Sequence, residues 1–160
     1  MEWLKETIIN KGKVINETLL NLDQVLNHQV DPLLMMKVGE SFADAYRSEN
    51  ITKVLTVESS GISVAFATAY HLRVPFIFAR RKKTLMTDGD VYCERVPSFT
   101  KGIVTDIVVP RALLGEGDHV LLVDDIIANG DAAKGLMRIV EQSGASIAGW
   151  GIVVEKCFQD

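Results

Sequence analysis

The stretch HVLLVDDIIANGDAAKGL, His119 to Leu136, decides the fold. An apolar run ends in two adjacent carboxylates, Asp124 and Asp125, and a short loop then leads into a helical pattern. A strand, a turn and a helix in succession form the repeating unit of an α/β fold. Two neighbouring negative charges at the end of a buried strand are costly to desolvate unless a cation or a hydrogen-bonding ligand meets them. The stretch therefore predicts an α/β fold with a binding site at the end of this strand.

The same rhythm of strand, turn and helix runs from residue 51 to the end of the sequence. The apolar runs predict strands at residues 53–57, 75–79, 102–110, 119–125 and 146–156. The helical patterns cover residues 2–10, a segment that starts at Asp31-Pro32, a segment that follows the turn at 58–61, and residues 132–143. Strands that alternate with helices indicate a twisted, mostly parallel sheet flanked by helices.

Residues 80–101 show no steady period and are too many for an ordinary connection. Such long loops are commonly functional. We expect the part of this segment from Lys82 to Thr100 to close over a bound substrate, with Tyr92, Ser98 and Lys101 as contacts of the lid.

Length and composition limit the possible classes of protein. The 160 residues suit a single domain, and the formal net charge of −4 argues against a nucleic-acid partner. No apolar run approaches the roughly 20 residues that span a bilayer, so we expect no membrane segment. The N-terminus lacks the apolar core and cleavage site of a signal peptide, which predicts a cytoplasmic location.

Polar residues stand at or just beyond the ends of the predicted strands. They are Glu58, Arg80, Asp124, Asp125 and Lys156. Ligands of open α/β sheets bind beyond the carboxyl ends of the strands. We therefore expect these side chains to gather at one edge of the sheet.

The loop between strand and helix, residues 128–132, is a candidate phosphate site. Backbone N–H groups and the helix dipole favour an anion there, and Gly130 permits a positive φ and a close approach of the backbone. The alternative is that Asn-Gly serves turn geometry alone. The glycine patterns of nucleotide hydrolases and of dinucleotide-binding folds are absent from the sequence.

Asp124 and Asp125 suit the hydroxyl groups of a sugar or a hydrated Mg²⁺ ion. The alternative is that one of them caps the loop and the other is solvated. The basic run from Arg80 to Lys83 could bind a phosphorylated small molecule, or could be a solvated charge run.

The motif VLLVDDIIANGDA resembles the phosphoribosyl-pyrophosphate (PRPP) motif of type I phosphoribosyltransferases. The resemblance covers nearly the whole chain, and the stretches that carry it are LNHQVDPLLM (26–35), ITKVLTVESSGI (51–62), PSFTK (97–101) and GASIAGWGIVVEKCFQ (144–159). The first and last of these are similar to the xanthine-specific branch of the family. The resemblance implies the type I fold, with an N-terminal hood over residues 1–32 and a core over 33–160 in one domain.

The resemblance also implies an activity. It is the transfer of phosphoribosyl from PRPP to xanthine, which gives xanthosine 5′-monophosphate and pyrophosphate, with Mg²⁺ as cofactor and a homodimer as the assembly. Similar enzymes hold the 5′-phosphate on the backbone of the phosphate loop and the ribose near Asp124 and Asp125. The loop residues are Ala128, Asn129, Gly130, Asp131 and Ala132. The metal is expected to be held through ligand and water rather than by the protein directly.

Two further sites follow from the resemblance. The turn Glu58-Ser59-Ser60-Gly61 matches the pyrophosphate loop, which often carries a cis peptide bond, and Arg80 is the basic residue assigned to it. Leu20, Asn27 and Lys156 match the positions that bind the base. An ammonium at Lys156 can meet a purine carbonyl oxygen, and Asn27 offers both a donor and an acceptor. This pair favours an oxo-purine over adenine.

Other interpretations stay open. Ala128 replaces the Asp that hypoxanthine-guanine enzymes carry near the base, so no general base is evident in the motif. Similar enzymes continue beyond the position of Gln159, and we expect the family's C-terminal tail to be absent here. The alternatives are an adenine or a guanine/hypoxanthine phosphoribosyltransferase, and a non-catalytic module that senses PRPP.

Overall fold

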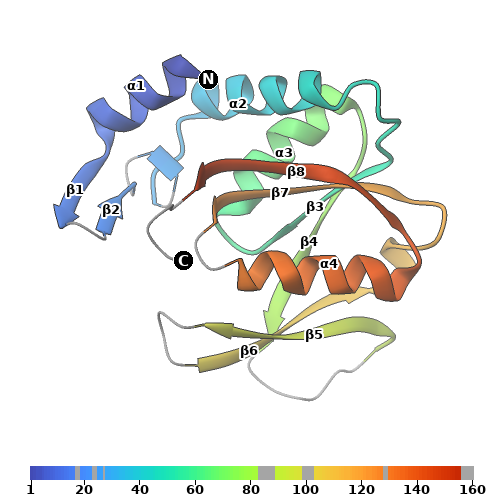
Figure 1. The fold of residues 1–160 in the computed structure, drawn as a ribbon. Coiled ribbons are helices and arrows are strands. Elements are labelled where there is room, and N and C mark those ends of the chain that lie inside the picture. The colour runs from blue at the N-terminus through green and yellow to red at the C-terminus, as the bar shows by residue number, and fades with distance from the viewer. Residues whose placement is uncertain are drawn as a thin grey trace.

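A six-stranded sheet forms the centre of the computed structural model, which describes residues 1–16, 19–22, 25–26, 28–82, 89–98, 103–127 and 130–155. The strands lie in the order β5-β6-β4-β3-β7-β8 (Figure 1). Their bounds are β3 Lys53–Val57, β4 Phe76–Lys82, β5 Val91–Ser98, β6 Ile103–Pro110, β7 His119–Ile127 and β8 Ser146–Glu155. β3 pairs in parallel with β4 and β7, and β7 pairs in parallel with β8, whereas β6 is antiparallel to β4 and β5. The predicted mostly parallel sheet is confirmed, with an antiparallel pair added at one edge.

Helices cover both faces of this sheet because the side chains of the central strands alternate between two cores. α2 (Pro32–Ala45) and α3 (Gly61–Leu72) share one core with Val54, Leu121 and Val123. α4 (Asp131–Ser143) shares the other core with neighbouring positions of the same strands, such as Leu55 and Leu122. Figure 1 shows α2 and α3 on one side of the sheet and α4 on the other.

The start of α2 follows the expected chemistry. The Asp31 carboxylate accepts hydrogen bonds from the backbone N–H of Leu33 (3.1 Å) and Leu34 (3.2 Å), and Pro32 occupies the first helical position. Within the described ranges, no helix has the length and apolar character needed to cross a membrane.

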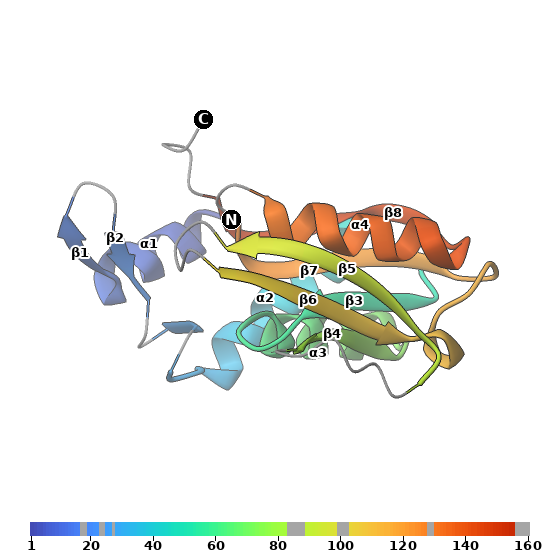
Figure 2. The same cartoon turned by 90° about the horizontal axis from the view of Figure 1, so that it is seen from below.

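The N-terminal segment lies at the side of the molecule where β7 and β8 end (Figures 1 and 2). It comprises α1 (Glu2–Lys11), β1 (Lys13–Asn16) and β2 (Leu19–Asn21). Leu4, Leu22 and Leu26 belong to the core that α2 and α3 cover, and the Lys37 ammonium lies 4.1 Å from the centre of the Trp3 ring. These contacts hold the segment beside the carboxyl ends of the strands.

The prediction of a long loop at residues 80–101 is wrong for much of its length. β4 continues to Lys82, and β5 pairs with β6 along its whole length, from Val91 opposite Pro110 to Ser98 opposite Ile103. Tyr92 is only 6% exposed and its hydroxyl donates to Leu114 O at 3.2 Å, so this residue belongs to the core and not to a lid. The strand was hard to recognise in VYCERVPS because polar and charged residues occupy its exposed positions, so the sequence contains no clear apolar run. Lys101 lies outside the described residues.

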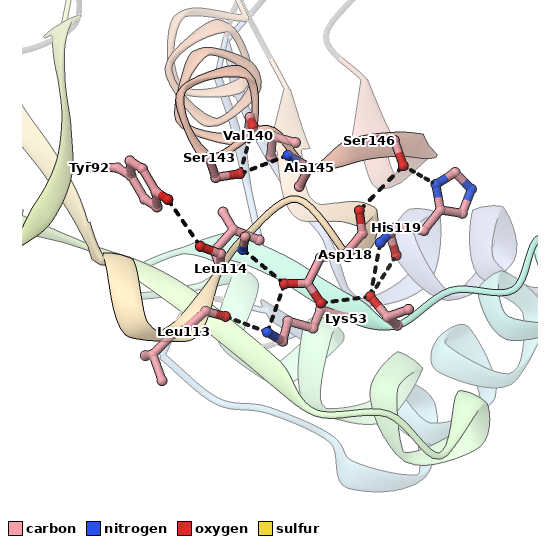
Figure 3. A network of polar contacts seen from close by, with 12 residues as sticks. Lys53, Tyr92, Leu113, Leu114, Asp118, His119, Val140, Ser143, Ala145 and Ser146 are labelled. Carbon is pink, nitrogen blue, oxygen red and sulfur yellow. Dashed lines mark hydrogen bonds and ion pairs between the residues drawn. The ribbon is translucent and has the colours of Figure 1, made fainter.

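A polar network lies at the amino ends of the strands, where β3, β7 and β8 begin (Figure 3). The Asp118 carboxylate accepts hydrogen bonds from Lys53 Nζ (2.9 Å), Thr52 Oγ1 (2.9 Å) and Gly115 N (3.0 Å). Burial alone would raise the pKa of Asp118, but these three donors outweigh burial and hold the pKa below its ordinary value. The network therefore ties the loop before β7 to the start of β3.

Candidate functional site

Three strand ends meet at the carboxyl edge of the sheet because β3 is hydrogen-bonded to β4 on one side and to β7 on the other. The turn after β3 contacts the end of β4 through Glu58, Arg80 and Arg81. Gly61, the first residue of α3, lies against Asp124 at the end of β7. The structure thus brings together Glu58, Arg80 and the Asp124-Asp125 pair at one edge, as predicted.

The turn from Glu58 to Gly61 is fastened to β4. One carboxylate oxygen of Glu58 accepts from Arg81 N at 2.6 Å, and the other lies 3.5 Å from Arg80 Nε. The Glu58–Ser59 peptide bond is cis, as the resemblance implied. The two arginines engage the Glu58 carboxylate, and the next residue of the turn, Ser59, is exposed to solvent.

The acidic pair is buried and has no ion-pair partner among the described residues. Asp124 is 8% exposed and Asp125 is 5% exposed, and in the ranges the structure covers no Lys, Arg or His lies within ion-pair distance of either. The backbone N–H of Asp125 donates to Asp124 Oδ1 at 3.0 Å. Burial, and next the neighbouring Asp125 charge, raise the pKa of Asp124 to about 8, while Arg81 opposes this shift. The ionised form of such a carboxylate is stabilised when a hydrogen-bond donor or a cation reaches it.

The start of α4 follows the acidic pair along the chain. Gly130 has φ +74°, the positive value predicted for it, and it precedes the first helical residue, Asp131. No described side chain caps this helix. The N–H groups of the first turn, which includes Ala132, are therefore available to an anion. Ala128 and Asn129 lie outside the described residues.

Sequence reasoning missed Thr56, which lies beside the acidic pair. Its side chain is fully buried in β3, and its hydroxyl finds no hydrogen-bond partner in the described part of the chain. The available signal was a single neutral polar residue within the otherwise apolar end of KVLTV.

The predicted base-binding positions are described only in part. Leu20 lies in β2, where it pairs with Val14. Asn27 and Lys156 lie outside the described residues, as does Lys83 of the basic run.

The donors at this edge fit a hydrated magnesium ion shared with a ligand. Among the described residues, no group of three or more His, Cys, Asp or Glu side chains is placed to hold a metal. The two aspartates offer only oxygen atoms, and Mg²⁺ typically combines one or two carboxylates with waters and substrate phosphates.

Comparison with known proteins is consistent across sequence and structure. The phosphoribosyl transferase domain family matches residues 23–157. A xanthine phosphoribosyltransferase from Moorella thermoacetica is 52% identical over 159 residues, which cover 99% of this chain and 81% of that protein. One from Bacillus mycoides is 51% identical over 160 residues, which cover 100% of this chain and 81% of that protein.

Two solved structures show the fold. Adenine phosphoribosyltransferase from Rhodothermus marinus superposes with a TM-score of 0.77 at 25% identity, over 97% of this chain and 88% of that one. The Saccharomyces cerevisiae enzyme, solved with adenine and an imino-altritol bisphosphate, gives 0.78 at 21% identity, over 99% of this chain and 92% of that one.

Proposed function

Because the chain belongs to the phosphoribosyltransferase family, we propose that it transfers phosphoribosyl from PRPP to xanthine, giving xanthosine 5′-monophosphate and pyrophosphate. The observation that carries the proposal is the buried acidic pair, Asp124 and Asp125, between the turn at Glu58–Ser59 and the start of α4, which no described side chain caps. The choice of xanthine as the base is supported by relatives at 51–52% identity that are named xanthine phosphoribosyltransferase.

The acidic pair accounts for the chemistry at the sugar. As the bond from C1 to pyrophosphate breaks and the bond from C1 to the purine nitrogen forms, positive charge develops on the ribose, as in glycoside cleavage. Asp124 and Asp125 bind the ribose hydroxyls, and the net negative charge of the pair faces this cation. Such charge favours the transition state over the ground state.

Two anion sites flank the sugar in this proposal. The backbone of residues 128–132 binds the 5′-phosphate at the start of α4. The turn of Ser59, Ser60 and Gly61 binds the pyrophosphate, and Glu58 holds Arg80 and Arg81 beside it. The positive charge of the arginines stabilises the leaving anion.

Magnesium would be held by the phosphate oxygens of PRPP and by water near Asp124 and Asp125, and would supply further positive charge to the leaving group. The base is assigned to the N-terminal hood, residues 1–32, together with Lys156. Leu20 would cover the ring, and Asn27 and Lys156 would recognise its polar edge.

We also propose a homodimer that uses the outer face of α3 and β4. Phe66, Tyr70 and Phe78 are 54%, 63% and 37% exposed, and the Phe66 and Phe76 rings lie 6.1 Å apart. Beside them is an apolar hollow of about 440 Å³ that reaches Ser59 of the turn. Exposed apolar patches of this kind mark interaction surfaces. Phe66→Glu should yield monomers in analytical ultracentrifugation, whereas an unchanged mass would contradict the use of this face.

Turnover with xanthine, guanine, hypoxanthine and adenine, each with PRPP and Mg²⁺, tests the function. We expect the highest kcat/KM with xanthine. A preference for adenine, or for hypoxanthine and guanine, would show that the preferred base is not xanthine. Binding of PRPP without formation of any product would favour a sensing module. A cytoplasmic location is a separate prediction, to be checked by cell fractionation.

A further inference from the structure

The hydroxyl of Thr56 is buried beside the acidic pair and has no hydrogen-bond partner among the described residues. A buried hydroxyl without a partner is costly, and each such group in a folded protein calls for an explanation, such as a role at a binding or catalytic site. Thr68 provides the contrast. It is equally buried, but its hydroxyl donates to Val64 O at 2.8 Å within α3.

Gly61 shows where the Thr56 hydroxyl points. A Cβ added at Gly61 would lie 2.2 Å from Thr56 Oγ1 and 2.7 Å from Asp124 Oδ1. Both oxygens therefore converge on one small space, which is open because residue 61 has no side chain. They are not hydrogen-bonded to each other in this structure.

We propose that Thr56 is a positioning residue for Asp124, whose Oδ1 accepts a hydrogen bond from the Thr56 hydroxyl when the ribose of PRPP binds. The inference rests on the proposed function, because Thr56 acts only through Asp124. The inference also explains why residue 61 is a glycine, since any side chain at this position would separate the Thr56 and Asp124 oxygens.

The geometry of Asp124 explains what this contact would achieve. Oδ1 already accepts from Asp125 N at 3.0 Å, and a carboxylate oxygen can accept a second hydrogen bond. Two donors on Oδ1 would fix the carboxylate plane and leave Oδ2 for a ribose hydroxyl. The charged groups that act on Asp124 are Asp125 on β7 and Arg81 on β4, so the neutral Thr56 adds a donor without adding a charge.

The test compares Thr56→Val, which keeps the shape and removes the hydroxyl, with Thr56→Ser, which keeps the hydroxyl. We expect Thr56→Val to lower kcat/KM for PRPP about 10- to 100-fold, the value of one hydrogen bond to a charged group, and to leave KM for the base unchanged. Its melting temperature should equal or exceed that of the wild type, because an unsatisfied polar group has been removed. Thr56→Ser should restore kcat/KM to within about threefold of wild type.

Thr68→Val is the matched control, because it removes an equally buried hydroxyl from the neighbouring helix and should leave kcat/KM unchanged. Gly61→Ala gives a second test and should lower kcat/KM for PRPP at least as much as Thr56→Val. Equal activity of Thr56→Val and wild type would overturn the inference, as would equal impairment of the Val and Ser variants. A wild-type protein that neither binds PRPP nor forms product would overturn the proposed function, whereas an active wild type with an unaffected Thr56→Val variant would overturn this inference alone.

Discussion

Asp118 directly precedes β7 and Asp124 lies in its C-terminal part, and their carboxylates have opposite surroundings. Asp118 accepts hydrogen bonds from Lys53, Thr52 and Gly115, and its pKa is lowered (Figure 3). Asp124 is buried beside a second carboxylate, and its pKa is raised to about 8. Asp118, with three donors from the protein, stabilises the fold. Asp124 accepts a hydrogen bond from Asp125 N but finds no ion-pair partner among the described residues, so it is available to a ligand.

The largest effect is expected at the carboxyl edge of the sheet. The double change Asp124→Asn and Asp125→Asn should lower kcat by about 100-fold or more, because it removes the charge that faces the ribose. The melting temperature should stay the same or rise, since burying this acidic pair is unfavourable in the folded protein. Steady-state kinetics and thermal unfolding check both outcomes, and near-wild-type turnover would contradict the role of the pair.

At the other edge the same chemical change should act on stability alone. Asp118→Asn should lower the free energy of unfolding by about 2 kcal/mol, because Lys53 loses a charged partner at a partly buried site. Asp44→Asn is the control, since the Asp44–Arg47 pair is exposed and should contribute less than about 0.5 kcal/mol. Urea unfolding measures both, and a fall in kcat of folded Asp118→Asn would mean that the two edges are not separate.

The two acids also predict opposite responses to pH. The folded pKa of Asp124 lies above its unfolded value of 3.8, so the folded protein holds the extra proton and loses stability as pH rises from 3.8 towards 8. For Asp118 the folded pKa is the lower one, so its stabilisation is present above 3.8 and disappears as pH falls below that. One pKa unit corresponds to about 1.4 kcal/mol.

Unfolding in urea between pH 5 and pH 8, without ligand, tests the sign for Asp124. The wild type should lose stability relative to Asp124→Asn over this interval, by on the order of 1 kcal/mol or more. A constant difference between the two proteins would show that Asp124 is ionised throughout.

The smallest effect concerns the hydrogen bond between His119 Nδ1 and Ser146 Oγ, which joins the starts of β7 and β8 (2.7 Å, Figure 3). Ser146→Ala should lower the free energy of unfolding by about 0.5–1 kcal/mol, because the pair is exposed, and should leave kcat unchanged. A clear change in the kcat of folded Ser146→Ala would contradict the division between the two edges.

The residues of the parallel half of the sheet predict their structure well, because periodicity and turn chemistry agree there. KVLTV forms β3 within its predicted bounds, and Asp31-Pro32 starts α2 as expected. β5 was missed because an edge strand with charged residues lacks a clear apolar run. Local sequence cannot show that Tyr92 is buried, since its burial depends on pairing with β6.

The site was predictable where strand ends carry charge and unpredictable where a contact depends on packing. The acidic pair and the turn at Glu58 meet as expected, because their strands are neighbours. The spacing of residues could not predict that the Glu58 carboxylate accepts a hydrogen bond from Arg81 N. The role of the Thr56 hydroxyl becomes apparent only from the position of Gly61 beside it.

The central claim is that the buried carboxylates of Asp124 and Asp125, which have no ion-pair partner among the described residues, form the site for PRPP. Isothermal titration calorimetry with PRPP in the presence of excess Mg²⁺ tests it most directly. The account predicts saturable binding by the wild type and by Asp118→Asn, and a loss of binding when Asp124 and Asp125 are both changed to Asn. Binding that survives the double change, or a folded wild type that takes up no PRPP, would contradict it.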